Sequence, residues 1–239
     1  MSAIVPGPVC TPGLGSCLAV SFTPPDTRVC SFDCTYCAVP RQPRRGAGVR
    51  WPTPGEIASA VANALPQAAA YDSLMVGGCG EPTLHPYFTA ALLGVMGVVR
   101  ADRPDMAVRV RTCGAQLHRG EVRRGLDLAD ERILKLDPAP ERTQRPSAST
   151  PLGAVIAGAS ALRDLCIQAV LLDGADGNCD EASLEEWIEL LNELRPRLVY
   201  LTTPEGPRAE GRVLPVARTR LEKVAAQLAE RTGIPAALP

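Results

Sequence analysis

The chain has 239 residues, of which 46% are hydrophobic, and its 25 Lys and Arg residues nearly balance 26 Asp and Glu residues. A chain of this length buries a substantial core, and we expect one domain, residues 1–239, rather than two. The balanced charge gives no general attraction for polyanions, so nucleic acid is a possible partner but not a favoured one. The longest apolar stretches, such as residues 90–99, are far shorter than the roughly 20 residues of a membrane-spanning helix, so we expect no membrane contact.

The nine cysteines are an odd number, at positions 10, 17, 30, 34, 37, 79, 113, 166 and 179. The first residues lack the charged, then apolar, then small pattern of a secretory leader. We therefore expect reduced thiols and a cytoplasmic location rather than a disulfide framework.

After a short N-terminal segment (1–15), apolar runs typical of buried strands alternate with amphipathic helical patterns. The first helix has the clearest signal, because Thr53 and Glu56 have capping-box spacing around Pro54. Ser183 gives a similar signal for a later helix that runs to Leu194. The predicted strands cover 16–22, 73–76, 106–111, 132–136, 166–172 and 198–201, and the predicted helices cover 54–65, 86–100, 120–126, 152–165, 183–194 and 217–230.

Six strand–helix units with right-handed crossovers indicate an α/β fold. We predict a partial (βα)6 TIM-like barrel with a parallel sheet in a single domain. In such barrels the functional groups lie on the loops that follow the C-terminal ends of the strands.

The loop after the first predicted strand carries Cys30, Cys34 and Cys37 in a C-x3-C-x2-C pattern, with Tyr36 before the last cysteine. Three thiolates at this spacing can hold three irons of a [4Fe–4S] cluster and leave the fourth iron open for a small ligand. A zinc site is the alternative, but no fourth Cys or His follows at zinc spacing, since the next candidates are Cys79 and His85. We therefore predict a cluster loop at residues 30–37.

The second predicted strand runs into a glycine-rich turn, Gly77-Gly78-Cys79-Gly80-Glu81-Pro82. Glycine lets the backbone approach a ligand closely, and the bare N–H and C=O groups can pair with that ligand. Such a turn is a weak signal by itself. Together with the cysteine triplet it predicts a cofactor site at the mouth of the barrel.

In these two segments and in their strand context, the chain resembles the radical S-adenosylmethionine (radical SAM) superfamily. Within that superfamily it is most similar to the compact iron–sulfur oxidoreductases related to the tRNA wyosine-base synthases. The segments that carry this further likeness are Gly7-Pro8-Val9, residues 14–20, residues 80–86, Lys135-Leu136-Asp137 and Arg145-Pro146.

The resemblance implies that the open iron chelates the amino and carboxylate groups of S-adenosylmethionine. An electron from a low-potential donor, flavodoxin or ferredoxin, then breaks the sulfonium bond. The resulting 5′-deoxyadenosyl radical abstracts hydrogen from a substrate that the sequence leaves undetermined. The cofactor carries out this chemistry, and the protein orients the cofactor and excludes water.

By the same resemblance Gly78, Gly80 and Glu81 line the methionine amino group. Lys135 supplies a cation for the methionine carboxylate and Asp137 an anion for the ribose hydroxyls, because residues two apart on a strand share a face. A structural ion pair is the alternative reading of that pair.

The resemblance implies two further cofactor contacts, Tyr36 and Asn178. Tyr36 would stack on or flank the adenine, unless it only shields the cluster. Asn178 falls after the fifth strand, where relatives place a polar cofactor contact, although a plain turn residue is nearly as good an interpretation.

The chain departs from its relatives at Cys79, inside the glycine turn, and at Cys113, which stands where relatives have asparagine. We predict that these are catalytic thiols, acting as ligands of a second cluster, as a hydrogen donor or as a methyl carrier. Cys10 and Cys17 flank the first strand, so four thiols are expected to converge near the cluster. The alternative is that they are small buried hydrophobes.

The leading prediction is a radical SAM enzyme acting on a small molecule or a peptide. Three alternatives remain open from the sequence. The first is tRNA modification of the wyosine type, the second is a glycyl-radical activase, and the third is a non-catalytic iron–sulfur or zinc-binding module.

Overall fold

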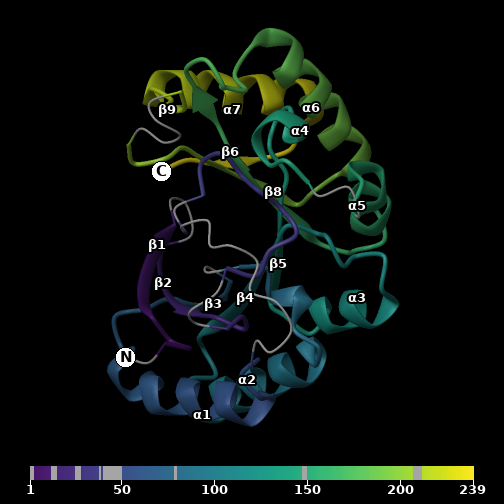
Figure 1. Ribbon diagram of the computed structural model, residues 1–239. Coiled ribbons are helices and arrows are strands. Elements are labelled where there is room, and N and C mark those ends of the chain that lie inside the picture. Colours follow the sequence, from purple (N-terminus) through teal and green to yellow (C-terminus); the bar gives the residue numbers. More distant parts are fainter. Residues whose placement is uncertain are drawn as a thin grey trace.

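An open, curled sheet of eight strands forms the centre of the protein, and helices line its outer face (Figure 1). This computed structural model describes residues 3–11 (9–11 for the backbone only), 15–24, 28–37, 39, 50–77, 80–146, 150–206 and 212–239. The strands lie in the order β1-β2-β3-β4-β5-β6-β8-β10, and all neighbours are parallel except β1 and β2. Their bounds are β1 Gly7–Thr11, β2 Gly15–Val20, β3 Ser73–Val76, β4 Ala107–Thr112, β5 Glu131–Lys135, β6 Leu165–Val170, β8 Leu198–Thr202 and β10 Ala236–Ala237.

The connections between these strands are mostly helical. The helices are α1 Pro54–Ala64, α2 Phe88–Asp102, α3 Gly120–Leu126, α4 Pro140–Thr143, α5 Leu152–Ala159, α6 Glu181–Leu194 and α7 Arg218–Thr232. Two 3₁₀ turns, Leu65–Gln67 and Pro82–Leu84, and a small antiparallel pair of β7 Leu172–Asp173 with β9 Leu214–Pro215 complete the described elements. The predicted partial barrel is confirmed, with β2, β3, β4, β5, β6 and β8 as its six strands.

Local signals account for the helix that the sequence predicts best. The Thr53 hydroxyl accepts a hydrogen bond from the Glu56 N–H at 3.2 Å, and the Glu56 carboxylate accepts one from the Thr53 N–H at 2.8 Å. Pro54 lies in the first turn, where a missing N–H costs nothing. The helix buries Ile57 and Val61 against the outer face of the sheet.

Three sequence predictions need correction. Asp180, not Ser183, caps α6, and its carboxylate accepts from the Ser183 N–H at 3.0 Å. Helix α5 ends at Ala159, short of the predicted Leu165, because residues 160–164 form a turn, with Asp164 at a positive φ, and Leu165 is the first residue of β6. The N-terminal segment contains β1, which pairs antiparallel with β2; Pro8 argues against an inner strand but is compatible with the edge position it occupies.

The interior of the barrel is packed at the end where the strands begin, which we call the barrel floor. Its apolar part consists of Cys17, Met75, Ile133, Cys166 and Tyr200, one residue from each of five strands. The larger core lies between the sheet and the outer helices. The opposite end, where the strands finish, is therefore the end that is left for a ligand.

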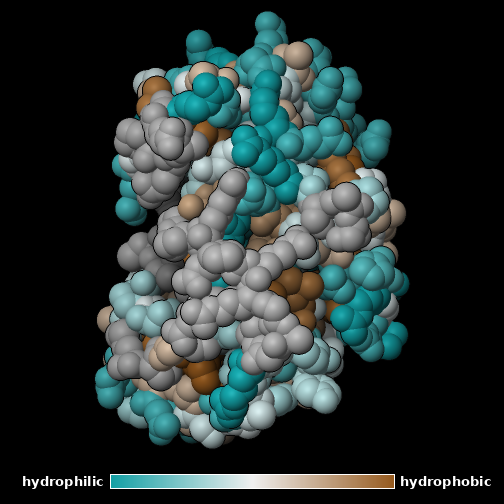
Figure 2. All heavy atoms as spheres, in the orientation of Figure 1, coloured by the Kyte–Doolittle hydropathy of each residue, from teal (hydrophilic) through white to brown (hydrophobic). Residues whose placement is uncertain are grey.

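Polar side chains cover much of the outer helical layer (Figure 2). In the described part of the chain, no helix has the length and apolar character needed to cross a bilayer.

Candidate functional site

The cluster loop follows β2 at the C-terminal end of the barrel, and its three thiols, Cys30, Cys34 and Cys37, are half-buried. The Cys37 N–H donates to the Cys34 carbonyl at 3.1 Å, which forms a tight turn around Tyr36. The C-terminal end of α4 holds one side of the loop. The N–H of Thr35 donates to the Thr143 carbonyl at 2.8 Å, and that of Asp33 donates to the Gln144 carbonyl at 3.1 Å.

The glycine turn after β3 holds the other side of the loop. Val29 and Gly80 form a parallel bridge, and the Glu81 N–H donates to the Val29 carbonyl at 2.8 Å. A Cβ on Gly80 would lie 2.4 Å from the Val29 carbonyl oxygen and 2.9 Å from Thr23 Cγ2, so only glycine fits there. The adjoining Gly78 and Cys79 lie outside the described residues.

Glu81 joins the glycine turn to the end of β4. Its buried carboxylate accepts from the Thr83 N–H at 3.1 Å, from the Thr112 hydroxyl at 2.5 Å and from the Cys113 N–H at 2.7 Å. Each oxygen thus has a protein donor. Glu81 fixes the turn, and its predicted contact with a methionine amino group remains a prediction.

Tyr36 brings Lys135 and Asp137 together from the end of β5. The Tyr36 hydroxyl donates to Asp137 Oδ2 at 2.5 Å, and Lys135 Nζ lies 4.6 Å from the centre of the Tyr36 ring. Asp137 follows the last residue of β5 instead of lying on the strand, and its Oδ1 accepts from the Val170 N–H at 2.9 Å. Burial raises the pKa of Asp137 to about 6, while Lys135 and the Tyr36 hydrogen bond oppose that shift.

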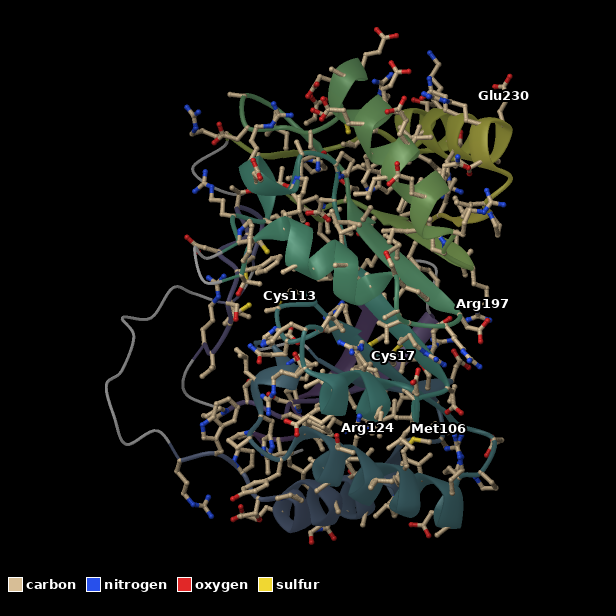
Figure 3. All side chains as sticks on the ribbon, turned by 90° about the vertical axis from the view of Figure 1, so that its right-hand side faces the viewer. Cys17, Met106, Cys113, Arg124, Arg197 and Glu230 are labelled. Atoms are coloured by element: carbon tan, nitrogen blue, oxygen red, sulfur yellow. The ribbon has the colours of Figure 1, made fainter. Side chains whose placement is uncertain are left out.

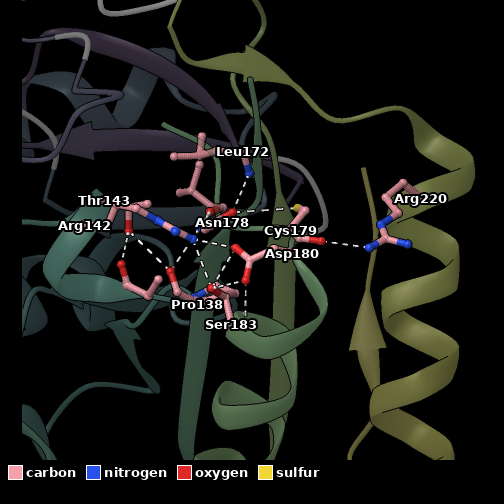
Figure 4. Close-up of polar contacts among 11 residues, drawn as sticks. Pro138, Arg142, Thr143, Leu172, Asn178, Cys179, Asp180, Ser183 and Arg220 are labelled. Carbon is pink, nitrogen blue, oxygen red and sulfur yellow. Dashed lines mark hydrogen bonds and ion pairs between the residues drawn. The ribbon is translucent and has the colours of Figure 1, made fainter. Parts of the chain in front are cut away.

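Asn178 lies fully buried behind this group, where all its polar atoms bind the backbone (Figure 4). Its Oδ1 accepts from the Leu172 N–H at 2.7 Å, and its Nδ2 donates to the carbonyls of Val170 at 2.9 Å and Pro138 at 3.2 Å. Both amide hydrogens are used, so Asn178 joins the end of β6 to the loop after β5. Its contact with a cofactor stays a prediction.

Cys113 is the predicted catalytic thiol that the structure places beside the cluster loop. It is buried, its thiol interacts with that of Cys30, and its N–H is held by Glu81. The interaction with Cys113 lowers the pKa of Cys30, whereas burial and the same interaction raise the pKa of Cys113.

Cys17 does not join this group, and the expected convergence of four thiols is wrong for it. The Ser73 hydroxyl donates to Cys17 Sγ at 3.1 Å, at the barrel floor. In Figure 3 Cys113 lies toward one end of the barrel, and Cys17 and Arg197 lie toward the other. The physical reason is that Cys17 is the third residue of β2, so the strand has yet to run to the mouth. The side chains of Cys10 and Cys79 lie outside the described residues.

Two site residues belong to none of the sequence motifs. Gln144 is fully buried; its Oε1 accepts from the Asp137 N–H at 3.0 Å and its Nε2 donates to the Lys135 carbonyl at 2.9 Å, which fixes the end of β5. Arg111 projects from β4 into the barrel, where its guanidinium donates to Gln168 Oε1 at 3.4 Å. Only alternation along β4 indicates its inward position.

His85, by contrast, has a structural role at the turn that precedes α2. The Tyr87 N–H donates to His85 Nδ1 at 3.0 Å, so its Nε2 is the nitrogen that donates to the Pro52 carbonyl at 2.8 Å.

An open cavity of about 820 Å³ lies elsewhere, between α1 and the N-terminal segment, and none of the predicted site residues lines it.

The family comparison decides the identity of this site. The family model of the Radical SAM superfamily matches residues 25–142, which include the cluster loop, the glycine turn and the Lys135–Asp137 segment. Residues 25–142 are a radical SAM domain, the domain of a superfamily of enzymes. The predicted resemblance to this superfamily is therefore confirmed.

Individual proteins are similar to this chain in sequence or in fold. The chain is 27% identical over 240 residues to the UPF0026 protein MJ1312 of Methanocaldococcus jannaschii, covering 95% of this chain and 71% of that protein. Its fold is similar to that of TYW1 with a lysine-pyruvate adduct bound, with a TM-score of 0.63, 14% identity and coverage of 90% and 74% of the two chains. It is also similar to SuiB of Streptococcus suis bound to S-adenosylmethionine, with a TM-score of 0.63 and 15% identity over 92% of this chain and 50% of SuiB.

Membership in the radical SAM superfamily implies an iron–sulfur cluster and S-adenosylmethionine, and the donors present fit both groups. Three half-buried thiols share one anchored loop, and the Thr35 hydroxyl between them is buried with no hydrogen-bond partner among the described residues. Among the described residues, no three Cys, His, Asp or Glu side chains are grouped to hold a single metal ion. A cluster makes no such demand, because each thiolate binds a different iron.

Proposed function

We propose that Cys30, Cys34 and Cys37 bind a [4Fe–4S] cluster whose fourth iron takes S-adenosylmethionine, and that the enzyme abstracts hydrogen from a small molecule or a peptide. The observation that carries this proposal is the double anchoring of the cluster loop. Val29 joins it to the Gly80–Glu81 turn on one side, and Thr35 joins it to Thr143 on the other. Because the loop is held on both sides, its three thiols keep fixed positions at the barrel mouth.

When bound, the two cofactors would supply an electron and a 5′-deoxyadenosyl radical. The protein supplies position and exclusion of water. Gly78, Gly80 and Glu81 offer the backbone of the glycine turn to the methionine amino group.

Lys135 offers its ammonium group to the methionine carboxylate, while Tyr36 forms a wall beside it and aligns Asp137 near the ribose. The Tyr36 hydroxyl is held by Asp137, so the ring keeps one orientation. Asn178 supports this wall from behind.

Cys79 and Cys113 are proposed as catalytic thiols. The contact between the thiols of Cys113 and Cys30 supports this for Cys113, because it places a second sulfur next to a cluster ligand. Cys79 lies outside the described residues.

The proposed partners are a low-potential electron donor, flavodoxin or ferredoxin, and the substrate. With a net charge of −1 the chain gives no electrostatic support for a nucleic-acid substrate. We propose a cytoplasmic location, because the cluster loop and its neighbours need reduced thiols.

Anaerobic reconstitution with iron and sulfide tests this function. We expect four irons per chain and, after reduction with S-adenosylmethionine present, formation of 5′-deoxyadenosine. Cys30→Ala, Cys34→Ala and Cys37→Ala should each lose the cluster. Cys166→Ala is the matched control, because that thiol is buried at the barrel floor, and it should keep both cluster and cleavage. Bound zinc, or a protein donor on the fourth iron, would contradict the proposal.

A further inference from the structure

Arg111 lies inside the barrel, one layer deeper than Lys135. On β4 it is in register with Ile133, a residue of the barrel floor, whereas Lys135 is two residues further along β5 and is in register with Gln168. Gly77, which directly follows β3, lies beside Arg111. A Cβ at Gly77 would lie 3.2 Å from the carbonyl oxygen and 3.4 Å from the Cβ of Arg111, so a side chain there would crowd the Arg111 stem.

The neighbouring arginine shows how a cation inside this barrel is normally neutralised. Arg109, two residues earlier on β4, lies 3.1 Å from Glu131 Oε2, and Arg197 lies 2.6 Å from Glu131 Oε1. For Arg111, no ion pair with a carboxylate occurs within the part of the chain that the structure describes. Its one hydrogen bond there is the 3.4 Å contact with the neutral Gln168.

The carboxylates nearest the barrel mouth are already engaged. Glu81 accepts from Thr112 and Cys113, and Asp137 accepts from Tyr36 and Val170. Burial lowers the pKa of Arg111, while the neighbouring Cys17, Tyr36, Glu81 and Cys37 act in the opposite direction. Its register beside Ile133 and its hydrogen bond to Gln168 place the guanidinium above the barrel floor, on the side of the mouth. A half-buried cation without a counter-charge costs free energy unless a ligand supplies one.

We propose that Arg111, together with Gln168, forms an anion-binding subsite inside the barrel that receives a carboxylate or phosphate of the substrate. The guanidinium is planar and donates two parallel hydrogen bonds to either group, which would fix the orientation of the substrate below the cluster loop. The proposal rests on the proposed function and adds the substrate class: a small anionic molecule or an acidic peptide side chain.

The methionine carboxylate of S-adenosylmethionine is a second source of the same chemistry. The depth of Arg111 favours the substrate, because Lys135 lies one layer closer to the mouth and against Tyr36. The two sources make different predictions, since only a cofactor contact changes the affinity for S-adenosylmethionine.

The test compares Arg111→Gln and Arg111→Lys with Arg218→Gln, which removes an exposed arginine paired with Glu222. Each reconstituted protein, with S-adenosylmethionine bound, is titrated with inorganic phosphate and with malonate at constant ionic strength, and the melting temperature is followed. We expect both anions to raise the melting temperature of the unmodified protein and of Arg218→Gln. The rise should be lost in Arg111→Gln and partly kept in Arg111→Lys, while the Kd for S-adenosylmethionine changes less than twofold.

Three results would overturn the proposal: no anion effect in the unmodified protein, an equal effect in Arg111→Gln, or a tenfold weaker Kd for S-adenosylmethionine in Arg111→Gln. The last result would assign Arg111 to the cofactor. Formation of 5′-deoxyadenosine by the unmodified protein is measured in parallel. Its absence would refute the proposed function, whatever the anion titration gives, so the two failures are distinguishable.

Discussion

Gly80 lies at the point where the cluster loop meets the end of β3. The nearest atom to a Cβ at this position is the backbone carbonyl oxygen of Val29, which moves only if the loop moves. The same carbonyl accepts the Glu81 N–H, so the close approach and the hydrogen bond depend on each other. Because Gly80 has no Cβ, the loop that carries Cys30 can pack directly against the glycine turn.

Gly80→Ala is expected to displace the cluster loop and to reduce the iron bound after reconstitution at least fivefold. Gly97→Ala is the matched control, because Gly97 lies in α2 with no neighbour within 4 Å of its Cβ position. That change should leave iron binding intact and stabilise the helix by about 0.5–1 kcal/mol. Iron analysis and thermal unfolding of both variants check the pair, and equal iron contents would contradict the role of Gly80.

Helix α6 starts behind the site, and its N-cap is connected to α4. Asp180 accepts from the Ser183 N–H and, at 2.6 Å, from Arg142, which lies on α4 just before the residues that hold the cluster loop (Figure 4). The hydrogen bonds from Ser183 and Arg142 lower the pKa of Asp180 to about 2. One side chain thus begins a helix and orients the element next to the loop.

The lowered pKa of Asp180 has a defined consequence for stability. Because the carboxylate is favoured in the folded state, its contribution is complete above its ordinary pKa of 3.8 and is lost as the pH falls toward 2. Asp180→Asn should flatten the decline of the melting temperature in that window, and Asp180→Ala should cost about 1 kcal/mol at neutral pH through loss of the cap. Asp105→Asn, at an exposed loop residue, is the control, and an identical pH profile in Asp180→Asn would contradict the assignment.

At the scale of the whole molecule, the two ends of the barrel have different chemistry. The floor is closed by Glu131, which is buried and bonded to Arg109, Arg197 and Tyr200. The mouth carries the cluster loop, Tyr36 and Cys113. Because strands run from one end to the other, inward residues near a strand's start stabilise the floor, and inward residues near its end face the site.

Glu131→Gln should destabilise the fold by about 3 kcal/mol, because it removes the buried carboxylate that Arg109, Arg197 and Tyr200 share at the barrel floor. The cluster and the Kd for S-adenosylmethionine should be unchanged, because the site lies at the other end. Glu222→Gln, in the exposed pair with Arg218, should cost less than about 1 kcal/mol. Denaturant unfolding and a binding titration check these values, and a weakened Kd in Glu131→Gln would show that the two ends are coupled.

Local signals in the sequence are sufficient for much of the fold. The strand Ser73–Val76 and the helix Gly120–Leu126 have the predicted bounds, since apolar periodicity and capping residues act over only a few positions. Local signals do not predict the strand β1, because it contains Pro8, and a proline is tolerated there only because β1 lies at the edge of the sheet. The same holds for Asp180, whose role as cap is visible only once the helix start is known.

The sequence by itself determined the order of strand–helix units, the cysteine triplet and the glycine turn, because each is written in adjacent residues. Only the tertiary structure decided that Tyr36 binds Asp137, 101 residues away, that Cys113 meets Cys30 and that Cys17 lies at the floor. Such contacts depend on strand order and register across the barrel. Those are fixed by the packing of residues far apart in the chain, and no local pattern records them.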